Sequence, residues 1–213
     1  MSLIFHGYWR STASWRVRIG LALKGLDYTT VAHDLRRGEQ NDPKYRQLAP
    51  QGLTPALEAP QGPITQSVAI LEWLEETVPT PPLLPVAPYD RAMVRGMAAL
   101  IACDVHPLNN LRVLNALRES LGADDAAVRA WAGRWIAEGF AALEALTARH
   151  GGGFCFGDTP GLADCLLIPQ IYSAQRFGVD LLAYPHLMAI AEHARTLPAF
   201  IGTHPDNQAD ADR

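Results

Sequence analysis

Five prolines within ten residues separate two stretches of this chain that have different patterns. They are Pro79, Pro81, Pro82, Pro85 and Pro88. Proline fixes its own φ and lacks a backbone N–H, so such a stretch is stiff and non-helical, as linkers between domains often are. We therefore predict a first domain at 1–80, a linker at 81–88 and a second domain at 89–213.

Strand and helix signals alternate before the prolines. Apolar or β-branched runs predict strands at 3–5, 28–32, 56–58 and 63–65. Helical spacing of apolar residues predicts helices at 14–23 and 67–76, with Ser67 as the N-cap of the second, and a polar loop lies at 36–43. The first domain is therefore expected to be a small α/β layer.

The chain after the prolines is helical almost throughout. The predicted helices cover 89–121 with an interruption near His106–Pro107, then 124–150, 161–177 and 186–196. Asp164 is expected to cap the helix that begins at Gly161, and the polar tail after Pro205 is expected to be loose. The predicted fold class is an α/β domain followed by an all-α domain.

Charge and hydropathy exclude several classes of protein. The 213 residues carry a net charge of −4, and the 18 basic residues are spread along the chain, so nothing favours a nucleic-acid partner. No apolar run approaches the roughly 20 residues of a membrane helix, and the first six residues are too quickly polar for a signal peptide. We expect a soluble, cytoplasmic protein with no membrane partner.

The cysteines and histidines show no metal-type spacing. Cys103, Cys155 and Cys165 form neither a CxxC motif nor a disulfide framework, which suits a reducing compartment. We expect all three to be buried structural residues. The histidines form no metal-spaced set either, so we predict no metal site.

Hydroxyl side chains gather where the first strand leads into the first helix. Ser11, Thr12 and Ser14 lie at the start of that helix, where free N–H groups and the helix dipole favour an anion. A thiol placed there would lose its proton more easily. Taken alone, ordinary N-capping explains these hydroxyls better than a binding site does.

Two further segments of the first domain could receive an extended ligand. Pro55 cannot donate to a sheet ladder, so Thr54–Pro55 predicts either an edge strand or a cis bond that turns the Thr54 backbone outward. Gln66 and Ser67 begin the next helix, where N–H groups and the two side chains could hold a carboxylate. Taken alone, Gln66 and Ser67 are explained equally well as an ordinary helix cap.

Together these segments resemble the cytosolic glutathione transferases, and within them the zeta class, which contains maleylacetoacetate and maleylpyruvate isomerases. The sequence R-S-T-A-S-W-R-V-R-I at 10–19 is close to the zeta pattern R-S-S-C-S-W-R-V-R-I. Supporting motifs follow in order at 106–111, 156–158, 162–164 and 176–180. The resemblance covers nearly the whole chain and implies a thioredoxin-like domain followed by an all-α domain, in a homodimer.

The resemblance also implies roles for individual residues. Ser11 would donate to the thiolate of glutathione, with Thr12 and Arg10 beside it. The other positions that match glutathione contacts in the family are Gln40, Thr54, Pro55, Gln66, Ser67, His106 and Asn110. Ala13 replaces the cysteine of the zeta pattern, which puts in doubt any role of a protein thiol but not the glutathione chemistry.

The implied reaction is a cis–trans isomerisation that uses glutathione as catalyst. A thiolate that adds to the cis double bond leaves a single bond that rotates, and loss of the thiolate gives the trans product. The small-molecule substrate is a cis-unsaturated diacid, and arginine suits its carboxylates because the planar guanidinium pairs with two oxygens. The candidates are Arg10, Arg112 and Arg176.

Three functions remain open at this point. The first is isomerisation of maleylacetoacetate in tyrosine and phenylalanine breakdown, or of maleylpyruvate in gentisate breakdown. The second is a transferase that conjugates or dehalogenates with the same thiolate. The third is a non-catalytic module with the same fold, which the intact segments at Arg10–Thr12 and Gln66–Ser67 argue against.

Overall fold

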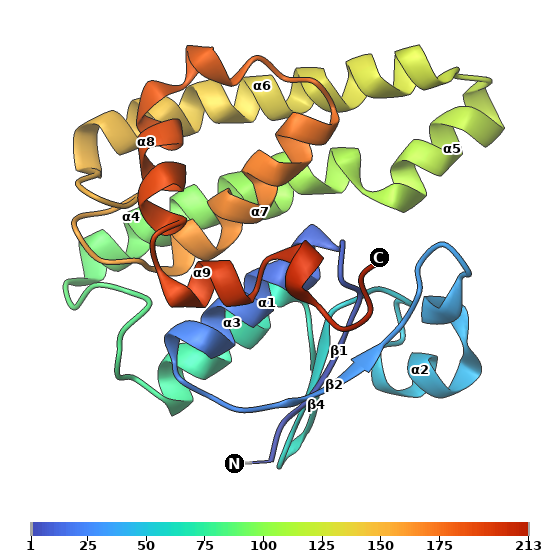
Figure 1. The fold of residues 1–213 in the computed structure, drawn as a ribbon, viewed down its shortest axis with the longest axis horizontal. Helices are drawn as coiled ribbons and strands as arrows, with labels where there is room; N and C mark the ends of the chain where they lie inside the picture. Colours follow the sequence, from blue (N-terminus) through green and yellow to red (C-terminus); the bar gives the residue numbers. More distant parts are fainter. Residues whose placement is uncertain (1, 213) are drawn as a thin grey trace. The chain divides into compact units, whose positions relative to one another are not determined.

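The computed structural model describes residues 2–212, and the chain forms two compact units (Figure 1). The first unit comprises the chain up to Leu83 together with the segment from Arg195 onward, and the second is Leu84–Ala194. The predicted second domain, 89–213, included that last segment. Its residues instead contact the first helix of the chain, as described below.

A four-stranded mixed sheet forms the centre of the first unit. Its strands are β1 (Ile4–Gly7), β2 (Thr29–Ala32), β3 (Ala56–Ala59) and β4 (Gly62–Thr65), in the order β2-β1-β3-β4. β1 runs parallel to β2 and antiparallel to β3, and β3 and β4 form a hairpin. A parallel pair needs a crossover between its strands, which the first helix supplies. Each strand lies where the sequence predicted one.

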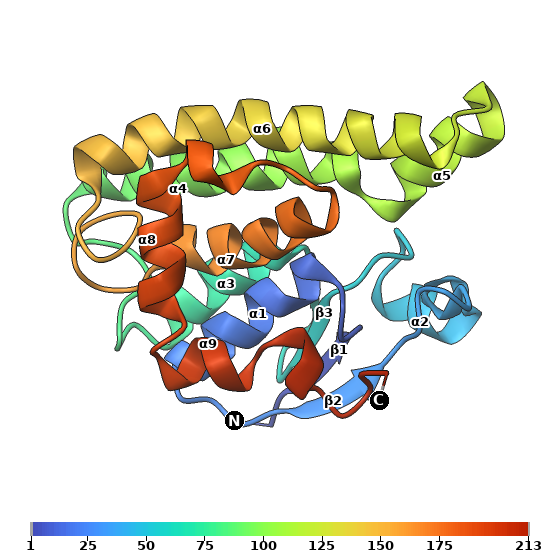
Figure 2. The same ribbon diagram turned by 45° about the horizontal axis from the view of Figure 1, so that its top comes forward.

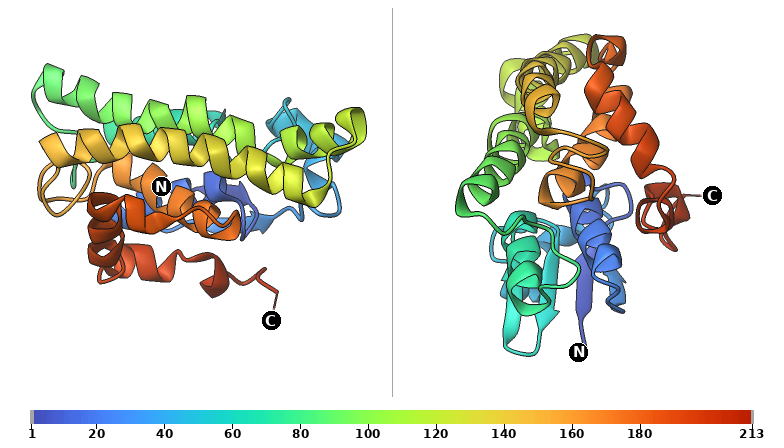
Figure 3. Two further views of the ribbon diagram at one scale, coloured as in Figure 1. Left: turned by 90° about the horizontal axis from the view of Figure 1, so that it is seen from above. Right: turned by 90° about the vertical axis from the view of Figure 1, so that its left-hand side faces the viewer.

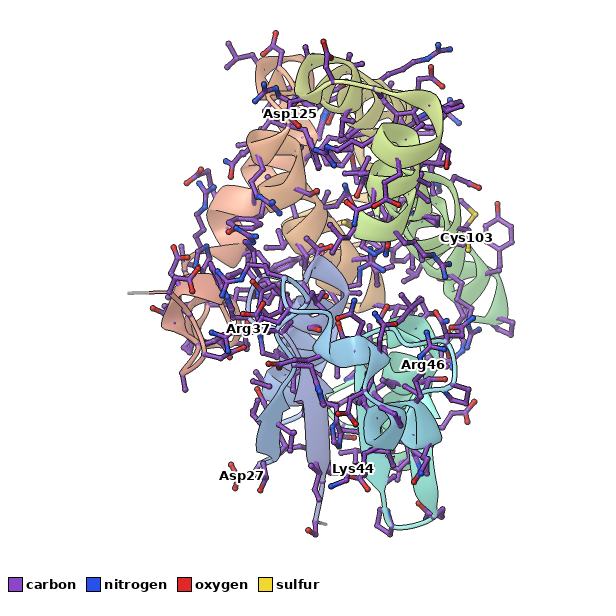
Figure 4. The ribbon with its side chains drawn as sticks, turned by 90° about the vertical axis from the view of Figure 1, so that its right-hand side faces the viewer. Asp27, Arg37, Lys44, Arg46, Cys103 and Asp125 are labelled. Carbon is purple, nitrogen blue, oxygen red and sulfur yellow. The ribbon has the colours of Figure 1, made fainter. Side chains whose placement is uncertain are left out.

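Two helices pack together on one face of this sheet, and a short third helix lies on the other (Figures 1 and 2). The pair consists of α1 (Thr12–Leu23) and α3 (Ser67–Thr77), and the short helix is α2 (Pro43–Leu48), which carries Lys44 and Arg46 on its exposed side (Figure 4). The 3-10 turn η1 (Glu39–Asn41) precedes α2. Gly20 allows α1 and α3 to approach closely, because a side chain there would clash with Leu71.

A buried ion pair attaches the start of the proline-rich linker to the first unit. Lys24 Nζ lies 2.7 Å from Glu75 Oε2, and both side chains are buried. Lys24 Nζ also donates to the Pro81 carbonyl at 2.6 Å, and the Leu83 N–H donates to Glu75 Oε2 at 2.7 Å. The Pro81 carbonyl and the Leu83 N–H belong to no helix or strand, so the ion pair supplies their hydrogen-bond partners.

The second unit consists of helices. They are α4 (Pro88–Ala99), the π-helical η2 (Leu100–Val105), η3 (His106–Asn109), α5 (Leu111–Leu121), α6 (Asp125–His150), α7 (Leu162–Arg176), η4 (Leu181–Ala183) and α8 (Pro185–Ala194). The predicted interruption near His106 is confirmed as the π and 3-10 turns between α4 and α5. The long helix α6 runs beside the α4-to-α5 stretch (Figures 2 and 3).

Asp164 joins the start of α7 to the loop before it, as its capping position predicted. Its carboxylate accepts from the N–H groups of Gly161 at 2.9 Å and Cys155 at 2.8 Å. Cys155 and Cys165 are buried, but Cys103 is exposed (Figure 4), so the expectation that all three cysteines are buried is wrong. Cys103 lies in the π-helical turn η2.

The C-terminal segment is fixed against the first unit, although its polar sequence predicted a loose tail. The short helix α9 (Pro198–Gly202) contacts α1, and Thr203 Oγ1 accepts from Trp15 Nε1 at 3.1 Å. After the turn η5 (Pro205–Asn207), Asp210 accepts from the Trp9 N–H at 2.9 Å. The prediction of a loose tail after Pro205 is therefore wrong. Within residues 2–212, no helix is long and apolar enough to cross a membrane.

We predict that Glu75→Ala lowers the free energy of unfolding by about 3–5 kcal/mol, because it leaves the buried Lys24 ammonium without its carboxylate. The urea midpoint of unfolding measures this loss. Glu76→Ala is the matched control, since Glu76 is the exposed neighbour on the same helix. Equal midpoints for the two variants would show that the ion pair contributes little to stability.

Candidate active site

Ser11 sits at the N-cap of α1 with its hydroxyl proton uncommitted. Its Oγ accepts from the Ser14 N–H at 3.2 Å, and its own N–H donates to the Tyr8 carbonyl at 3.1 Å. Among the hydrogen bonds described for residues 2–212, none has the Ser11 hydroxyl as its donor. A half-buried hydroxyl that already accepts one bond can therefore donate to an anion at the end of the helix.

The neighbouring polar side chains are placed differently from Ser11. Thr12, the first residue of the helix, is buried, and Ser14 Oγ is buried where it accepts from the Tyr8 N–H at 3.3 Å. Arg10 is half-buried, with its guanidinium 5.4 Å from the centre of the Trp9 ring. Of the three clustered hydroxyls, Ser11 is thus the one presented outward.

The start of α3 corrects one detail of the predicted cap. Gln66, not Ser67, occupies the N-cap position, and it makes no side-chain capping bond. Its φ of 71° lies in the region that favours glycine and costs a non-glycine residue about 1–3 kcal/mol. Its amide Nε2 donates to Gln51 Oε1 at 2.6 Å. A strained residue held by a side-chain bond at a helix start is typical of a binding site.

Ser67 is the first residue of α3 and is held by α1. Its Oγ accepts from Arg16 Nη1 at 3.3 Å, and both side chains are buried. A buried guanidinium beside free helix N–H groups makes this helix start electropositive, which suits a carboxylate. The sequence did not single out Arg16 or Gln51 as site residues, because their partners lie 51 and 15 positions away.

The loop before β3 carries the predicted peptide-binding residues. The Thr54–Pro55 bond is cis, one of the two alternatives that the sequence left open. The Leu53 carbonyl accepts from Tyr45 Oη at 2.7 Å, which joins this loop to α2. Gly52 lies against the backbone of Gln40, with no room for a larger side chain. The loop therefore lies between η1, α2 and the start of α3.

Two buried polar atoms near this loop have no protein partner. Among the described residues, neither Thr54 Oγ1 nor Gln40 Oε1 makes a hydrogen bond. Burying such an atom without a partner costs about 1–3 kcal/mol, so native structures rarely leave one unpaired. A polar ligand that bonds to them would remove this cost.

The remaining predicted residues belong to the second unit. His106 begins η3, and Asn110 is the N-cap of α5, where its Oδ1 accepts from the Arg112 N–H at 3.2 Å. The Arg112 side chain is exposed. Arg176 ends α7, also exposed, with its guanidinium 6.0 Å from the centre of the Tyr172 ring. Asn110 thus has a structural role in capping, whatever else it binds.

Known proteins match both halves of the chain. Residues 10–77 match the glutathione S-transferase N-terminal domain, and residues 125–198 match the glutathione S-transferase C-terminal domain. A maleylacetoacetate isomerase of Pseudomonas aeruginosa is 52% identical over 206 residues, covering 95% of this chain and 96% of that protein. The chain belongs to the glutathione S-transferase family. A Ralstonia maleylpyruvate isomerase is 47% identical, covering 97% of this chain and 98% of that protein.

Solved structures of relatives identify the class of this family that the chain resembles. A bacterial maleylpyruvate isomerase described as zeta-class has a TM-score of 0.96 at 47% identity, covering 100% of both chains. A maleylacetoacetate isomerase of Anaeromyxobacter dehalogenans, solved with bound glutathione, has a TM-score of 0.90 at 44% identity, covering 99% of this chain and 98% of that one. The zeta-class resemblance and the predicted fold class are thereby confirmed.

A hydrogen-bonded chain of three ionisable side chains lies in the sheet of the first unit, beside α2, and its central residue His6 is buried. His6 Nε2 lies 2.8 Å from Glu58 Oε1, and His6 Nδ1 lies 2.9 Å from His33 Nε2. The His33 ring also packs on Tyr45, with 4.2 Å between ring centres. If His6 Nε2 donates to Glu58, then His6 Nδ1 is the acceptor and His33 Nε2 the donor of the second bond.

We predict that acid weakens the fold through His33. Burial, and then the neighbouring His6, lower the pKa of His33 from its ordinary 6.5, although Glu39 and Asp42 act in the opposite direction. The unfolded chain then binds the proton more tightly than the folded chain, so stability falls as the pH drops below 6.5.

The urea midpoint measured between about pH 7 and about pH 5 tests this prediction. His33→Gln keeps an amide donor for His6 but cannot titrate, so its midpoint should fall less over that range. Burial also lowers the pKa of His204, so His204 adds an equal loss of stability in acid to the wild-type chain and to His33→Gln. An identical pH dependence in the two proteins would contradict the assignment.

Proposed function

We propose that this chain is a glutathione-dependent cis–trans isomerase that converts maleylacetoacetate to fumarylacetoacetate. The observation that carries the proposal is the Ser11 hydroxyl, half-buried at the start of α1 with a proton free to donate. The names and the identity of the relatives, 52% for the Pseudomonas isomerase, support the reaction.

The residues of the first unit fit glutathione. Its γ-glutamyl carboxylate suits the start of α3, where Arg16 and Ser67 meet and Gln66 is held by Gln51. The peptide part suits the Thr54–Pro55 loop and Gln40, whose unpaired buried oxygens need donors. The proposed thiol position is at Ser11. The three proposed subsites are neighbours. Arg16 of α1 bonds Ser67 of α3, Gln66 bonds Gln51 in the loop before β3, and that loop contacts Gln40 through Gly52.

Bound glutathione supplies a thiolate that adds to the cis double bond and later leaves, so it is regenerated. The Ser11 hydroxyl donates a hydrogen bond to this thiolate, and the N-terminus of α1 stabilises the negative charge. Arg10, adjacent in sequence, can pair with a carboxylate of the substrate. His106, Asn110, Arg112 and Arg176 stay predicted contacts of glutathione or substrate, and Thr12 a predicted neighbour of the thiolate.

Maleylpyruvate is the second candidate substrate. The relative from Ralstonia is a maleylpyruvate isomerase at 47% identity, only slightly below the Pseudomonas protein. Both substrates are cis-unsaturated diacids, so the arginines serve either one. The first would place the chain in tyrosine and phenylalanine breakdown, the second in gentisate breakdown. We also propose that the chain forms a homodimer and that it acts in the cytoplasm.

The test is the loss of ultraviolet absorbance of each substrate, followed by a hydrolase specific for the trans product. Conversion that needs glutathione but consumes none establishes an isomerase, and the better substrate names the reaction. No conversion of either substrate, together with tight glutathione binding, would instead support a conjugating or dehalogenating transferase.

We predict that Ser11→Ala lowers kcat/KM by about 10²-fold at neutral pH, because the thiolate loses a positioned donor. The same change removes a helix cap and costs about 1 kcal/mol of stability. Asp124→Ala is the matched control, since Asp124 caps α6 by accepting from Ala127 N at 2.8 Å. Full activity in Ser11→Ala would show that Ser11 does not stabilise the thiolate.

Arg176→Ala should raise KM for the diacid about ten-fold or more while glutathione affinity stays nearly unchanged, because a charged hydrogen bond to one carboxylate is lost. Arg134→Ala is the matched control. Arg134 is also exposed on a helix, with its guanidinium 5.3 Å from the centre of the Trp135 ring. The same KM in both variants would remove Arg176 from the substrate site.

A further inference from the structure

The backbone of the turn before Ser11 is held by side chains of the following helix and by one side chain that is distant in sequence. The Tyr8 N–H donates to Ser14 Oγ at 3.3 Å. The carbonyls of Tyr8 and Trp9 accept from the two terminal nitrogens of Arg18, at 3.4 and 2.9 Å. The Trp9 N–H donates to Asp210 Oδ2 at 2.9 Å, across 201 positions of sequence. Asp210 thus completes the hydrogen bonds of this turn.

The segment that carries Asp210 is itself anchored on α1 and on its own backbone. Arg18 Nε donates to the Thr203 carbonyl at 3.2 Å, so the guanidinium that holds the turn also holds the C-terminal segment. Gln208 Nε2 donates to the carbonyls of Gly202 at 3.2 Å and His204 at 2.9 Å. These bonds hold the C-terminal segment in place, so the position of Asp210 beside Trp9 is fixed.

A second attachment follows two residues later. Asp212 pairs with Arg36 in the loop after β2, with 3.1 Å between Arg36 Nη2 and Asp212 Oδ1. In Figure 2 the C-terminal segment returns beside α1 toward β2, in agreement with these contacts. Both side chains of the pair are about half exposed, so this ion pair adds little stability by itself. The bond to Trp9 is the stronger attachment, because it is partly buried.

We propose that the C-terminal segment 203–212 is a positioning strap for the thiolate site, in which Asp210 fixes the turn that aims the Ser11 hydroxyl. The inference rests on the proposed role of Ser11. The Ser11 N–H closes this turn by donating to the Tyr8 carbonyl at 3.1 Å, so a shift of Trp9 moves Ser11 with it. Hydrogen bonds weaken steeply when donor and acceptor lose alignment. Asp210 is thus a positioning residue that acts through Trp9.

A competing electrostatic effect has the opposite sign. The Asp210 carboxylate is negative, and removing a negative charge near a thiolate would lower the pKa of the thiol. Loss of the turn geometry would raise that pKa, because Ser11 would hold the thiolate less well. Asp210→Asn separates the two effects, since its amide oxygen can still accept from Trp9 but carries no charge.

The experiment measures the pKa of the bound glutathione thiol from its thiolate ultraviolet absorbance during a pH titration of the full chain. We expect Asp210→Ala to raise this pKa by about 0.5 to 1, with a loss of about three- to ten-fold in kcat/KM at neutral pH that high pH recovers. Asp210→Asn should not raise it. Affinity for S-methylglutathione, which has no thiol, should change less than about two-fold, because its other contacts are untouched.

Asp206→Ala is the matched control, because Asp206 is an exposed aspartate of the same segment whose neighbour is His204. The same thiol pKa in Asp206→Ala and Asp210→Ala would overturn the proposal, as would an equal loss of S-methylglutathione affinity. If Asp210→Ala does not fold, Asp210→Ser replaces it, because its shorter side chain lacks the carboxylate that accepts from the Trp9 N–H. An unchanged thiol pKa in that variant overturns the proposal. Absence of the thiolate signal in the wild-type chain would instead refute the proposed function.

Discussion

The buried Arg18 guanidinium connects the parts of the first unit that matter most for its chemistry. It donates to the carbonyls of Tyr8, Trp9 and Thr203, so one side chain of α1 fixes both the turn before Ser11 and the C-terminal segment. Burial lowers the pKa of Arg18 to about 10, which still leaves it charged at neutral pH. Bonds to three carbonyl oxygens and the nearby negative charge of Asp210 favour the charged form at this buried position.

The strands and the longer helices were predicted from sequence because they follow local patterns, whereas the short helices α2 and α9 were not predicted. Each predicted strand of the sheet was found, as was the break at His106, where a proline follows directly. The error at the C-terminus arose because it depends on contacts between distant residues, since the polar tail is fixed by Trp15 and Trp9. The exposure of Cys103 in the π-helical turn η2 was missed because that turn was predicted only as an interruption near His106.

The candidate site was predictable only in part for the same reason. The family motif and the helix starts pointed to Ser11, Thr54 and Ser67. Arg16, which holds Ser67, and Gln51, which holds Gln66, looked ordinary in sequence because their partners lie on other elements. A local pattern can show which residue faces a ligand, but the residues that support it become visible only in the folded chain.

The backbone of Gln66 is strained, and its side chain makes a bond that glycine could not make. Glycine would adopt its φ of 71° without strain, so a chain optimised only for folding would carry glycine at this position. Glycine would also lose the amide bond to Gln51. Under the proposed role of Gln66 in binding glutathione, the glutamine gives up some folding stability in return for a contact with the ligand.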